Sequence, residues 1–240
     1  MAKRYKAAVF DMDGTILDTI EDLKDAINHA MAHFGHKADF TAKETFAFFG
    51  SGALTALKRA LAAEKWLTDD QIAAIGTRDE PKLPFDSSIA DEILEYYKPY
   101  YAEHCAVKTG PYEGIIGLLS ELRKAGIKTA VVSNKPDEAV QTLCIDHFPG
   151  CFDHAAGEKA GIRRKPAPDM IYAALEDMGI APEDAVYVGD TEVDIETARN
   201  SDLDCICVDW GFRSRKQLLD CGAETIVSTC EELQSALLQA

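Results

Sequence analysis

The chain has 240 residues, 47% of them hydrophobic, and a formal net charge of −16 at neutral pH. This length suits one globular unit or a core domain with a smaller companion. The negative charge argues against a general nucleic-acid binder, which would need a basic surface. No apolar run is long enough to span a bilayer, so we expect no membrane partner. The first residues carry no signal-peptide pattern, and we expect a cytoplasmic location.

The first strand is predicted over residues 7–10, a short apolar run that ends abruptly in Asp11, Asp13 and Gly14. Two carboxylates two residues apart at the end of a buried strand are costly to hold as bare anions. We therefore expect a cation beside them, and Mg²⁺ is the hard divalent ion that prefers oxygen ligands. A simple turn at Asp13-Gly14 is the structural alternative.

An all-helical block is predicted to follow this strand directly. Apolar residues recur at helical spacing over residues 20–34 and 53–61, and Thr68 opens a short helix. A long helix begins near Ser87, and Pro99 should kink or interrupt it. No strand is evident between residues 17 and 105, so this segment reads as a separate helical unit.

From residue 106 onward, strands alternate with helices. This alternation is typical of an α/β fold with a doubly wound parallel sheet and helices on both of its faces. The predicted strands lie at residues 127–132, 151–155, 185–188 and 204–208. An odd number of cysteines, seven in all, shows no Cys-x-x-Cys spacing, and we expect them to be reduced.

Polar side chains follow several of the predicted strands. Asp11, Ser133 and Asp190 come directly after apolar runs, and Lys165 lies in a loop after another strand. Ligands of parallel sheets bind outside the carboxyl ends of the strands, so these residues should converge in one crevice. Carboxylates, a hydroxyl and an ammonium are the groups needed to handle a phosphate and a metal.

Each of these residues also has a purely structural interpretation. Ser133 and Asn134 could cap a helix, and Lys165 could belong to a solvated basic loop. Asp190-Thr191 could be a cap, with Asp194 favoured in the first helical turn by the helix dipole. The order of the residues along the chain and their places at strand ends favour a shared site over four separate coincidences.

The ordered motifs resemble those of the haloacid dehalogenase superfamily. The residues that carry the resemblance are Asp11-Met12-Asp13-Gly14-Thr15, Ser133-Asn134, Lys165-Pro166, and Gly189-Asp190 with Asp194. The helical block resembles the type 1 cap of that superfamily, and the phosphoglycolate phosphatase-like branch is the nearest fit. The resemblance implies a Rossmann-like core and a smaller helical cap, with core residues 1–16 and 91–240 and cap residues 17–90.

The resemblance also implies a role for each catalytic residue. Asp11 would be the nucleophile that takes the phosphoryl group as an aspartyl-phosphate. Asp13 would protonate the leaving alcohol and then activate water. Ser133 and Asn134 would hold phosphoryl oxygens, and Lys165 would neutralise the phosphoryl group and orient Asp11.

The metal implied by the resemblance is Mg²⁺. Its ligands would come from Asp11, the backbone carbonyl of Asp13, and Asp190, and Asp194 would support it directly or through water. We therefore expect a Mg²⁺-dependent hydrolase of a small phosphorylated metabolite, with 2-phosphoglycolate as the leading substrate and a monomeric or homodimeric state.

Two other functions remain open from the sequence. A sugar-phosphate phosphomutase similar to β-phosphoglucomutase would share the cap and both aspartates of the first motif, and its product would be an isomerised sugar phosphate. A phosphate-ligand binding or regulatory protein could use the same scaffold, because a fold does not by itself imply a function.

Overall fold

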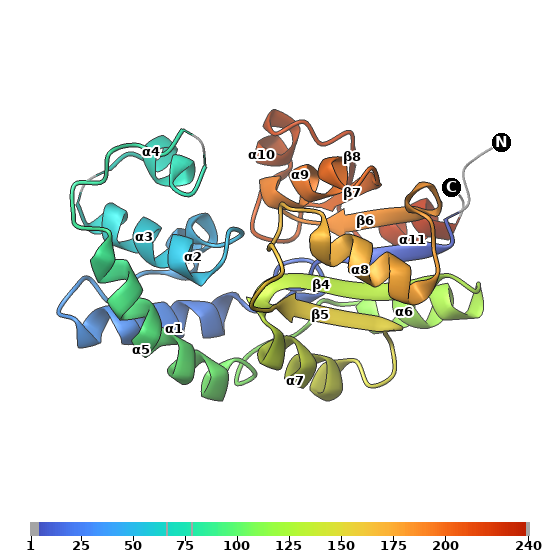
Figure 1. The fold of residues 1–240 in the computed structure, drawn as a ribbon, viewed down its shortest axis with the longest axis horizontal. Helices are drawn as coiled ribbons and strands as arrows, with labels where there is room; N and C mark the ends of the chain where they lie inside the picture. The colour runs from blue at the N-terminus through green and yellow to red at the C-terminus, as the bar shows by residue number, and fades with distance from the viewer. Residues whose placement is uncertain (1–4, 66, 78, 239–240) are drawn as a thin grey trace. The chain divides into compact units, whose positions relative to one another are not determined.

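The structure is a computed structural model that describes residues 5–65, 67–77 and 79–238 (Figure 1). The chain forms two compact units. The first unit comprises Met1–Asp18 with Gly110–Ala240, and the second comprises Thr19–Thr109. The expected combination of an α/β core with a helical segment after the first strand is confirmed.

A parallel sheet of six strands forms the centre of the first unit, in the order β5-β4-β1-β6-β7-β8. Strand β1, which pairs with β4 on one side and β6 on the other, is buried along its whole length and entirely apolar, as a strand covered on both faces must be. The strands are β1 (Ala7–Phe10), β4 (Lys128–Pro136), β5 (His154–Glu158), β6 (Ala185–Gly189), β7 (Asp204–Val208) and β8 (Thr225–Val227).

Helices cover both faces of this sheet. Successive side chains of β1 point to opposite faces, so Phe10 packs with Leu118 in one apolar cluster and Val9 packs with Ile171 in another. The expectation of a doubly wound sheet is therefore confirmed. The helices are α6 (Ile115–Lys124), α7 (Asp137–His147), α8 (Asp169–Met178), α9 (Glu192–Asn200), α10 (Arg215–Asp220) and α11 (Cys230–Leu238), with a 3-10 turn at Pro182–Asp184.

The second unit contains helices alone among its described residues. Its elements are α1 (Ile20–His33), α2 (Ala42–Phe48), α3 (Ala53–Glu64), α4 (Asp69–Ala74) and α5 (Ser88–His104). Arg59 of α3 is fully buried, and its guanidinium donates to the carbonyls of Phe48 and Ile75, each at 3.0 Å. These carbonyls lie at the ends of α2 and α4, so Arg59 ties two helix C-termini to α3.

The limits of the second unit differ from the expected range of residues 17–90. The unit continues to Thr109 because α5 packs against α1 and α3 and so belongs to the helical unit as a whole. Its last residues are fixed from within the unit, since the buried Asp22 carboxylate accepts the backbone N–H groups of Lys108 and Thr109, both at 2.9 Å. The expected return to the core at residue 91 is therefore wrong.

One further expectation for this region is corrected, and of the two effects expected of Pro99 the interruption is excluded. A two-residue strand, β2 (Leu17–Asp18), pairs antiparallel with β3 (Gly110–Pro111), although no strand was expected from residue 17 to 105. The α5 helix runs without interruption through Pro99, which is exposed. The missing N–H of Pro99 would have bonded the carbonyl of Glu95, which also lies on an exposed residue, so no buried carbonyl loses its partner.

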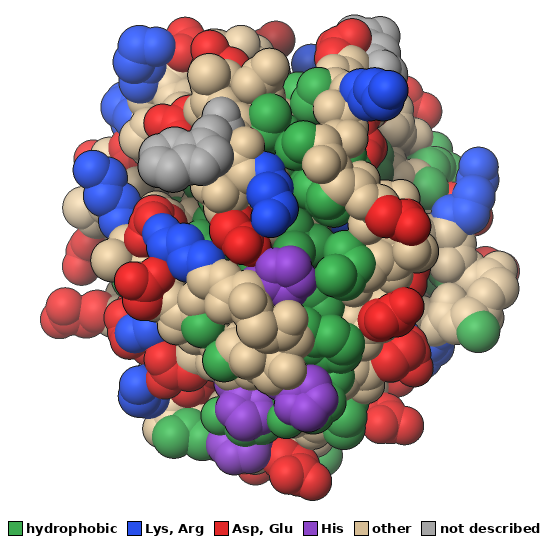
Figure 2. Space-filling view, turned by 90° about the vertical axis from the view of Figure 1, so that its left-hand side faces the viewer, with side chains coloured by type: hydrophobic (Ala, Val, Ile, Leu, Met, Phe, Trp, Pro, Cys, Tyr) green, Lys and Arg blue, Asp and Glu red, His purple; other side chains and the backbone are tan. Residues whose placement is uncertain are grey.

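The surface of the second unit carries an alternating stack of imidazole and phenol rings from α1 and α5. Ring centroids lie 3.9 Å apart for His33 and Tyr96, 3.8 Å for His29 and Tyr100, and 4.1 Å for Tyr100 and His104. Figure 2 shows histidine side chains gathered on one face of the molecule. The stack joins α1 to α5.

Among the described residues, no helix is both long and apolar enough to cross a membrane.

Candidate active site

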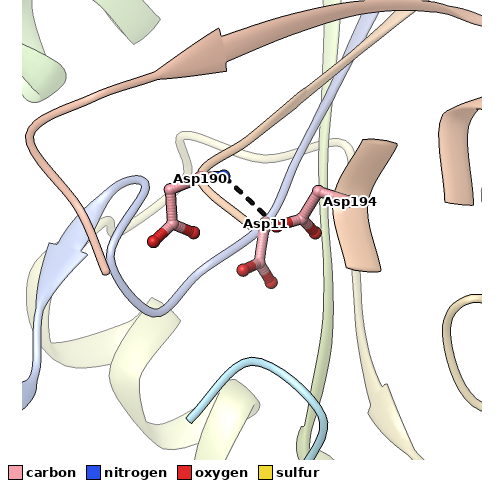
Figure 3. A group of neighbouring side chains, drawn as sticks. All are labelled: Asp11, Asp190 and Asp194. Atoms are coloured by element: carbon pink, nitrogen blue, oxygen red, sulfur yellow. Dashed lines mark hydrogen bonds between the residues drawn. The ribbon is translucent and has the colours of Figure 1, made fainter. Parts of the chain in front are cut away.

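Three buried carboxylates meet at the carboxyl edge of the sheet in the first unit (Figure 3). Asp11 follows β1, Asp190 follows β6, and Asp194 lies in the first turn of α9. One oxygen from each of the three lies within 4.8 Å of the others. The convergence expected from the order of the strands is thus present for these three residues.

Lys165 lies against two of these three carboxylates. Its Nζ is 2.7 Å from Asp11 Oδ1, 2.9 Å from Asp194 Oδ1 and 2.8 Å from the hydroxyl of Tyr187. The lysine side chain is only 2% exposed, so it is not part of a solvated loop. The neighbouring Arg163 is instead exposed and pairs with Asp169, as expected for a loop charge.

Tyr187 is a member of the cluster that the sequence reasoning missed. It is fully buried on β6, and its hydroxyl lies 3.0 Å from Asp194 Oδ1 as well as contacting Lys165. A buried tyrosine usually finds a partner for its hydroxyl. The signal in the sequence was therefore a single phenol within an otherwise apolar strand that ends just before Asp190.

Asp194 is held by more donors than any other carboxylate in this cluster. Its Oδ2 accepts the Thr191 hydroxyl at 2.7 Å and the backbone N–H groups of Thr191 at 3.0 Å and Asp190 at 3.2 Å. Its Oδ1 faces Lys165 and Tyr187. The contacts with Thr191 form the capping interaction of α9, so the structural interpretation of these residues is correct and is compatible with a role in the site.

Asp190 is fixed by the loops on either side of it. The Thr15 hydroxyl donates to Oδ1 at 3.1 Å, and the Phe212 backbone N–H donates to Oδ2 at 2.7 Å. Gly14, at a φ of +84°, passes so close that a Cβ there would lie 2.3 Å from Asp190 Oδ2. A glycine is required at this point for both conformation and space.

The last part of β4 supplies Ser133, Asn134 and an unexpected lysine. Asn134 Nδ2 donates to the backbone carbonyl of Lys165 at 3.0 Å, and Ser133 Oγ accepts the Lys135 N–H at 3.2 Å. The cap position of α7 is Pro136, so Ser133 and Asn134 are not capping residues of that helix. Lys135, which the sequence reasoning missed, places its Nζ 3.0 Å from Asp13 Oδ1.

Burial and mutual repulsion raise the pKa of two carboxyls in the cluster. Burial is the largest cause for Asp11, and the charges of Asp194 and Asp13 add to it, so its pKa rises to about 7 despite the opposing charge of Lys165. The pKa of Asp190 lies well above its usual range, because of burial first and of the charges of Asp194 and Asp11 next.

Lys165 has the opposite effect on Asp194. Burial acts to raise the pKa of Asp194, but the charge of Lys165 and the hydrogen bonds from Thr191 outweigh it and leave that pKa below its ordinary value. Burial likewise acts to lower the pKa of Lys165, but Asp11 and Asp194 raise it. One ammonium cannot balance three carboxylates, so the cluster has the charge and the oxygen donors that could hold a metal ion.

The doubly wound sheet and the acidic cluster with its buried lysine define an α/β enzyme with its site at the carboxyl edge of the strands. Residues 8–208 match the family model of the haloacid dehalogenase-like hydrolases. The chain belongs to this family.

Several similar proteins with assigned activities are phosphatases. A phosphoglycolate phosphatase of Mesorhizobium japonicum is 28% identical over 213 residues, covering 86% of this chain and 84% of that protein. An N-acetylmuramic acid 6-phosphate phosphatase of Pseudomonas aeruginosa is 32% identical over 99% of this chain and 96% of its own length. Together with the family match, these relatives indicate a phosphoric monoester hydrolase.

A solved structure from Lactobacillus delbrueckii subsp. bulgaricus is similar over the whole chain. It is 51% identical, has a TM-score of 0.96, and the match covers 99% of this chain and 100% of that one. Its own assignment as a phosphoglycolate phosphatase is provisional. The similarity extends through both units of the fold.

Proposed function

We propose that this phosphatase hydrolyses a small phosphomonoester through an aspartyl-phosphate on Asp11, with Mg²⁺ as its metal and 2-phosphoglycolate as its leading substrate. The observation that carries the proposal is the buried pair of Asp11 and Lys165, 2.7 Å apart, beside two further carboxylates. A carboxylate held by an ammonium at the edge of a parallel sheet is placed to attack an anionic group that the same ammonium attracts.

The metal would be held by a carboxylate oxygen of Asp11, a carboxylate oxygen of Asp190 and the backbone carbonyl of Asp13. An all-oxygen donor set with an excess of negative charge fits Mg²⁺. When bound, this ion would neutralise phosphoryl oxygens and so reduce their repulsion with Asp11. Asp194 already accepts five hydrogen bonds or ion contacts, which favours an indirect role through water or through Lys165.

The reaction would proceed in two displacements at phosphorus. Asp11 attacks the phosphoryl group, the bond from phosphorus to the ester oxygen breaks, and Asp13 gives a proton to the departing alcohol. Asp13 then takes a proton from water as that water attacks phosphorus, which releases inorganic phosphate and restores Asp11. Ser133, Asn134 and Lys165 would bind the phosphoryl oxygens through both steps.

The substrate beyond the phosphoryl group has two candidates that the relatives support. Several of the relatives are phosphoglycolate phosphatases. The relative that is 32% identical acts on N-acetylmuramic acid 6-phosphate, a phosphorylated amino sugar acid. Both substrates carry a carboxylate. A phosphomutase and a non-catalytic phosphate-binding protein are the alternatives in other classes. We further propose a cytoplasmic protein that is a monomer or homodimer.

The test is release of inorganic phosphate from a panel of phosphomonoesters with Mg²⁺ and, in parallel, with EDTA. We expect turnover to require Mg²⁺ and to favour 2-phosphoglycolate over sugar phosphates and p-nitrophenyl phosphate. Asp11→Asn should lower turnover by at least about 10³-fold, because the amide cannot serve as the nucleophile.

A matched control is Asp209→Asn. Asp209 also follows a strand of the sheet, but its carboxylate contacts Arg215 and Ser228 outside the cluster. This variant should keep turnover close to that of the wild type. Isomerised glucose phosphate without free phosphate would identify a mutase instead, and full activity of Asp11→Asn would refute the nucleophile assignment.

A further inference from the structure

Lys135 is a buried ammonium that the proposed reaction does not yet use. It lies near the end of β4, the strand that pairs directly with β1, where the pairing of β4 with β5 is irregular between Val132 and Pro136. Its side chain is only 2% exposed, and Nζ lies 3.0 Å from Asp13 Oδ1. Burying an ammonium is unfavourable unless an anion opposes it, and Asp13 is an anion that opposes this one.

The two oxygens of Asp13 differ in their surroundings. The side chain is 18% exposed, yet Oδ1 itself is buried from solvent. Of the two carboxylate oxygens, only Oδ2 can therefore contribute to the exposed surface of this side chain. Lys135 approaches the buried oxygen, which leaves Oδ2 as the atom that can face a reacting group.

The two lysines of the site serve different aspartates. Lys165 Nζ contacts Asp11 and Asp194, whereas Lys135 Nζ contacts Asp13. A hydrogen bond links their two segments, because the side-chain amide of Asn134, beside Lys135, donates to the backbone carbonyl of Lys165. The nucleophile and the acid/base residue are thus each held by an ammonium of their own.

We propose that Lys135 is a positioning residue that holds Asp13 Oδ1 and so directs Oδ2 at the ester oxygen of the substrate. The proposal rests on the proposed function of Asp13 as general acid and base. The Oδ2–H proton moves to the ester oxygen as its bond to phosphorus breaks and the electron pair stays on that oxygen. Oδ2 then accepts a proton from the attacking water.

The test separates substrates that need a proton from those that do not. The leaving alcohol of 2-phosphoglycolate requires protonation, whereas p-nitrophenolate leaves unprotonated. In single-turnover experiments with Mg²⁺, Lys135→Met should slow cleavage of 2-phosphoglycolate by about 10²-fold, the usual scale of general acid catalysis. Release of p-nitrophenol in the first turnover should fall far less, so the ratio of the two rates changes.

Two further variants keep the test independent of folding. Lys135→Arg retains a cation and should give an intermediate ratio, which provides the same contrast if Lys135→Met does not fold. Lys159→Met removes a lysine that is 50% exposed and pairs with Asp137, and it should leave both rates unchanged. Circular dichroism and thermal unfolding establish that each variant is folded.

The outcomes distinguish this proposal from the one on which it rests. Equal losses with both substrates would mean that Lys135 acts on the phosphoryl group or on the fold. That result would overturn the proposal that Lys135 positions Asp13. Unchanged rates with both would overturn it as well. Absence of phosphate release by the wild type from either ester would instead refute the proposed function before any variant is compared.

Discussion

At the scale of single residues, the site depends on one lysine whose hydrogen bonds are all satisfied internally. Lys165 Nζ has three partners, which are Asp11, Asp194 and the Tyr187 hydroxyl. An ammonium has three N–H groups, so these contacts set its direction, and a phosphoryl oxygen would share or replace one of them. Tyr187 is the partner without a charge and can be altered without changing the electrostatic balance.

We expect Tyr187→Phe to lower kcat about 10-fold with little change in KM, the scale of loss seen when a residue supporting a ligand is removed. The ring still fills its space on β6, but Lys165 and Asp194 each lose a contact. Steady-state kinetics with 2-phosphoglycolate measure the effect. The control is Tyr172→Phe, whose hydroxyl on the surface reaches the Asn200 carbonyl at 3.4 Å. Equal kcat in the two variants would contradict a supporting role for Tyr187.

At the scale of elements, the helices that the sequence reasoning missed had capping patterns that identify them. Thr41 and Glu44 form a capping box at the start of α2, and Ser214 and Gln217 form one at the start of α10. Both helices are short, so their apolar periodicity is weak and the cap is the stronger signal. The strand expected at residues 151–155 runs instead over His154–Glu158.

Arg59 has an effect on the second unit that its sequence position does not reveal. Its guanidinium meets carbonyls at the ends of α2 and α4, where the partial negative charge of each helix is concentrated. We expect Arg59→Met to lower the free energy of unfolding of this unit by about 3 kcal/mol, since buried acceptors lose charged donors. Urea unfolding followed by circular dichroism measures the change.

The neighbouring Lys58 supplies the matched control for this prediction. It is partly exposed on the same helix, so Lys58→Met should change the free energy of unfolding by no more than about 0.5 kcal/mol. A similar loss in both variants would show that the helix tolerates no substitution there. It would contradict the prediction that the buried guanidinium of Arg59 is the source of the loss.

At the scale of the whole molecule, the sequence predicts which polar residues stand at the strand ends but not which longer side chains reach into the site. Asp11 and Asp190 could be placed together because parallel strands end at one edge. Tyr187 and Lys135 could not be placed in the site from the sequence, since their roles depend on where a long side chain reaches. The end of the second unit was misplaced for a similar reason: the periodicity of α5 suits either unit, and only its packing on α1 and α3 decides.

The raised pKa of Asp11 predicts how the stability of the metal-free protein changes with pH. Its ordinary value is 3.8 and its value in the folded protein is about 7, so between these the folded state binds more protons than the unfolded state. The contribution of Asp11 to stability is therefore full below its ordinary value and is lost as pH rises through about 7. Asp190 acts in the same direction, and the lowered pKa of Asp194 acts in the opposite one.

The proposed magnesium site should therefore stabilise the protein more at high pH than at low pH. Below about pH 7, Mg²⁺ must displace the proton that Asp11 holds, and above it no proton competes. We expect the rise in Tm caused by a fixed concentration of Mg²⁺ to be clearly larger at about pH 8 than at about pH 5.5. Differential scanning calorimetry measures both values. Asp11→Asn, which cannot titrate, should show a smaller difference between the two, and an equal rise in the wild type at both pH values would argue against Mg²⁺ binding through Asp11.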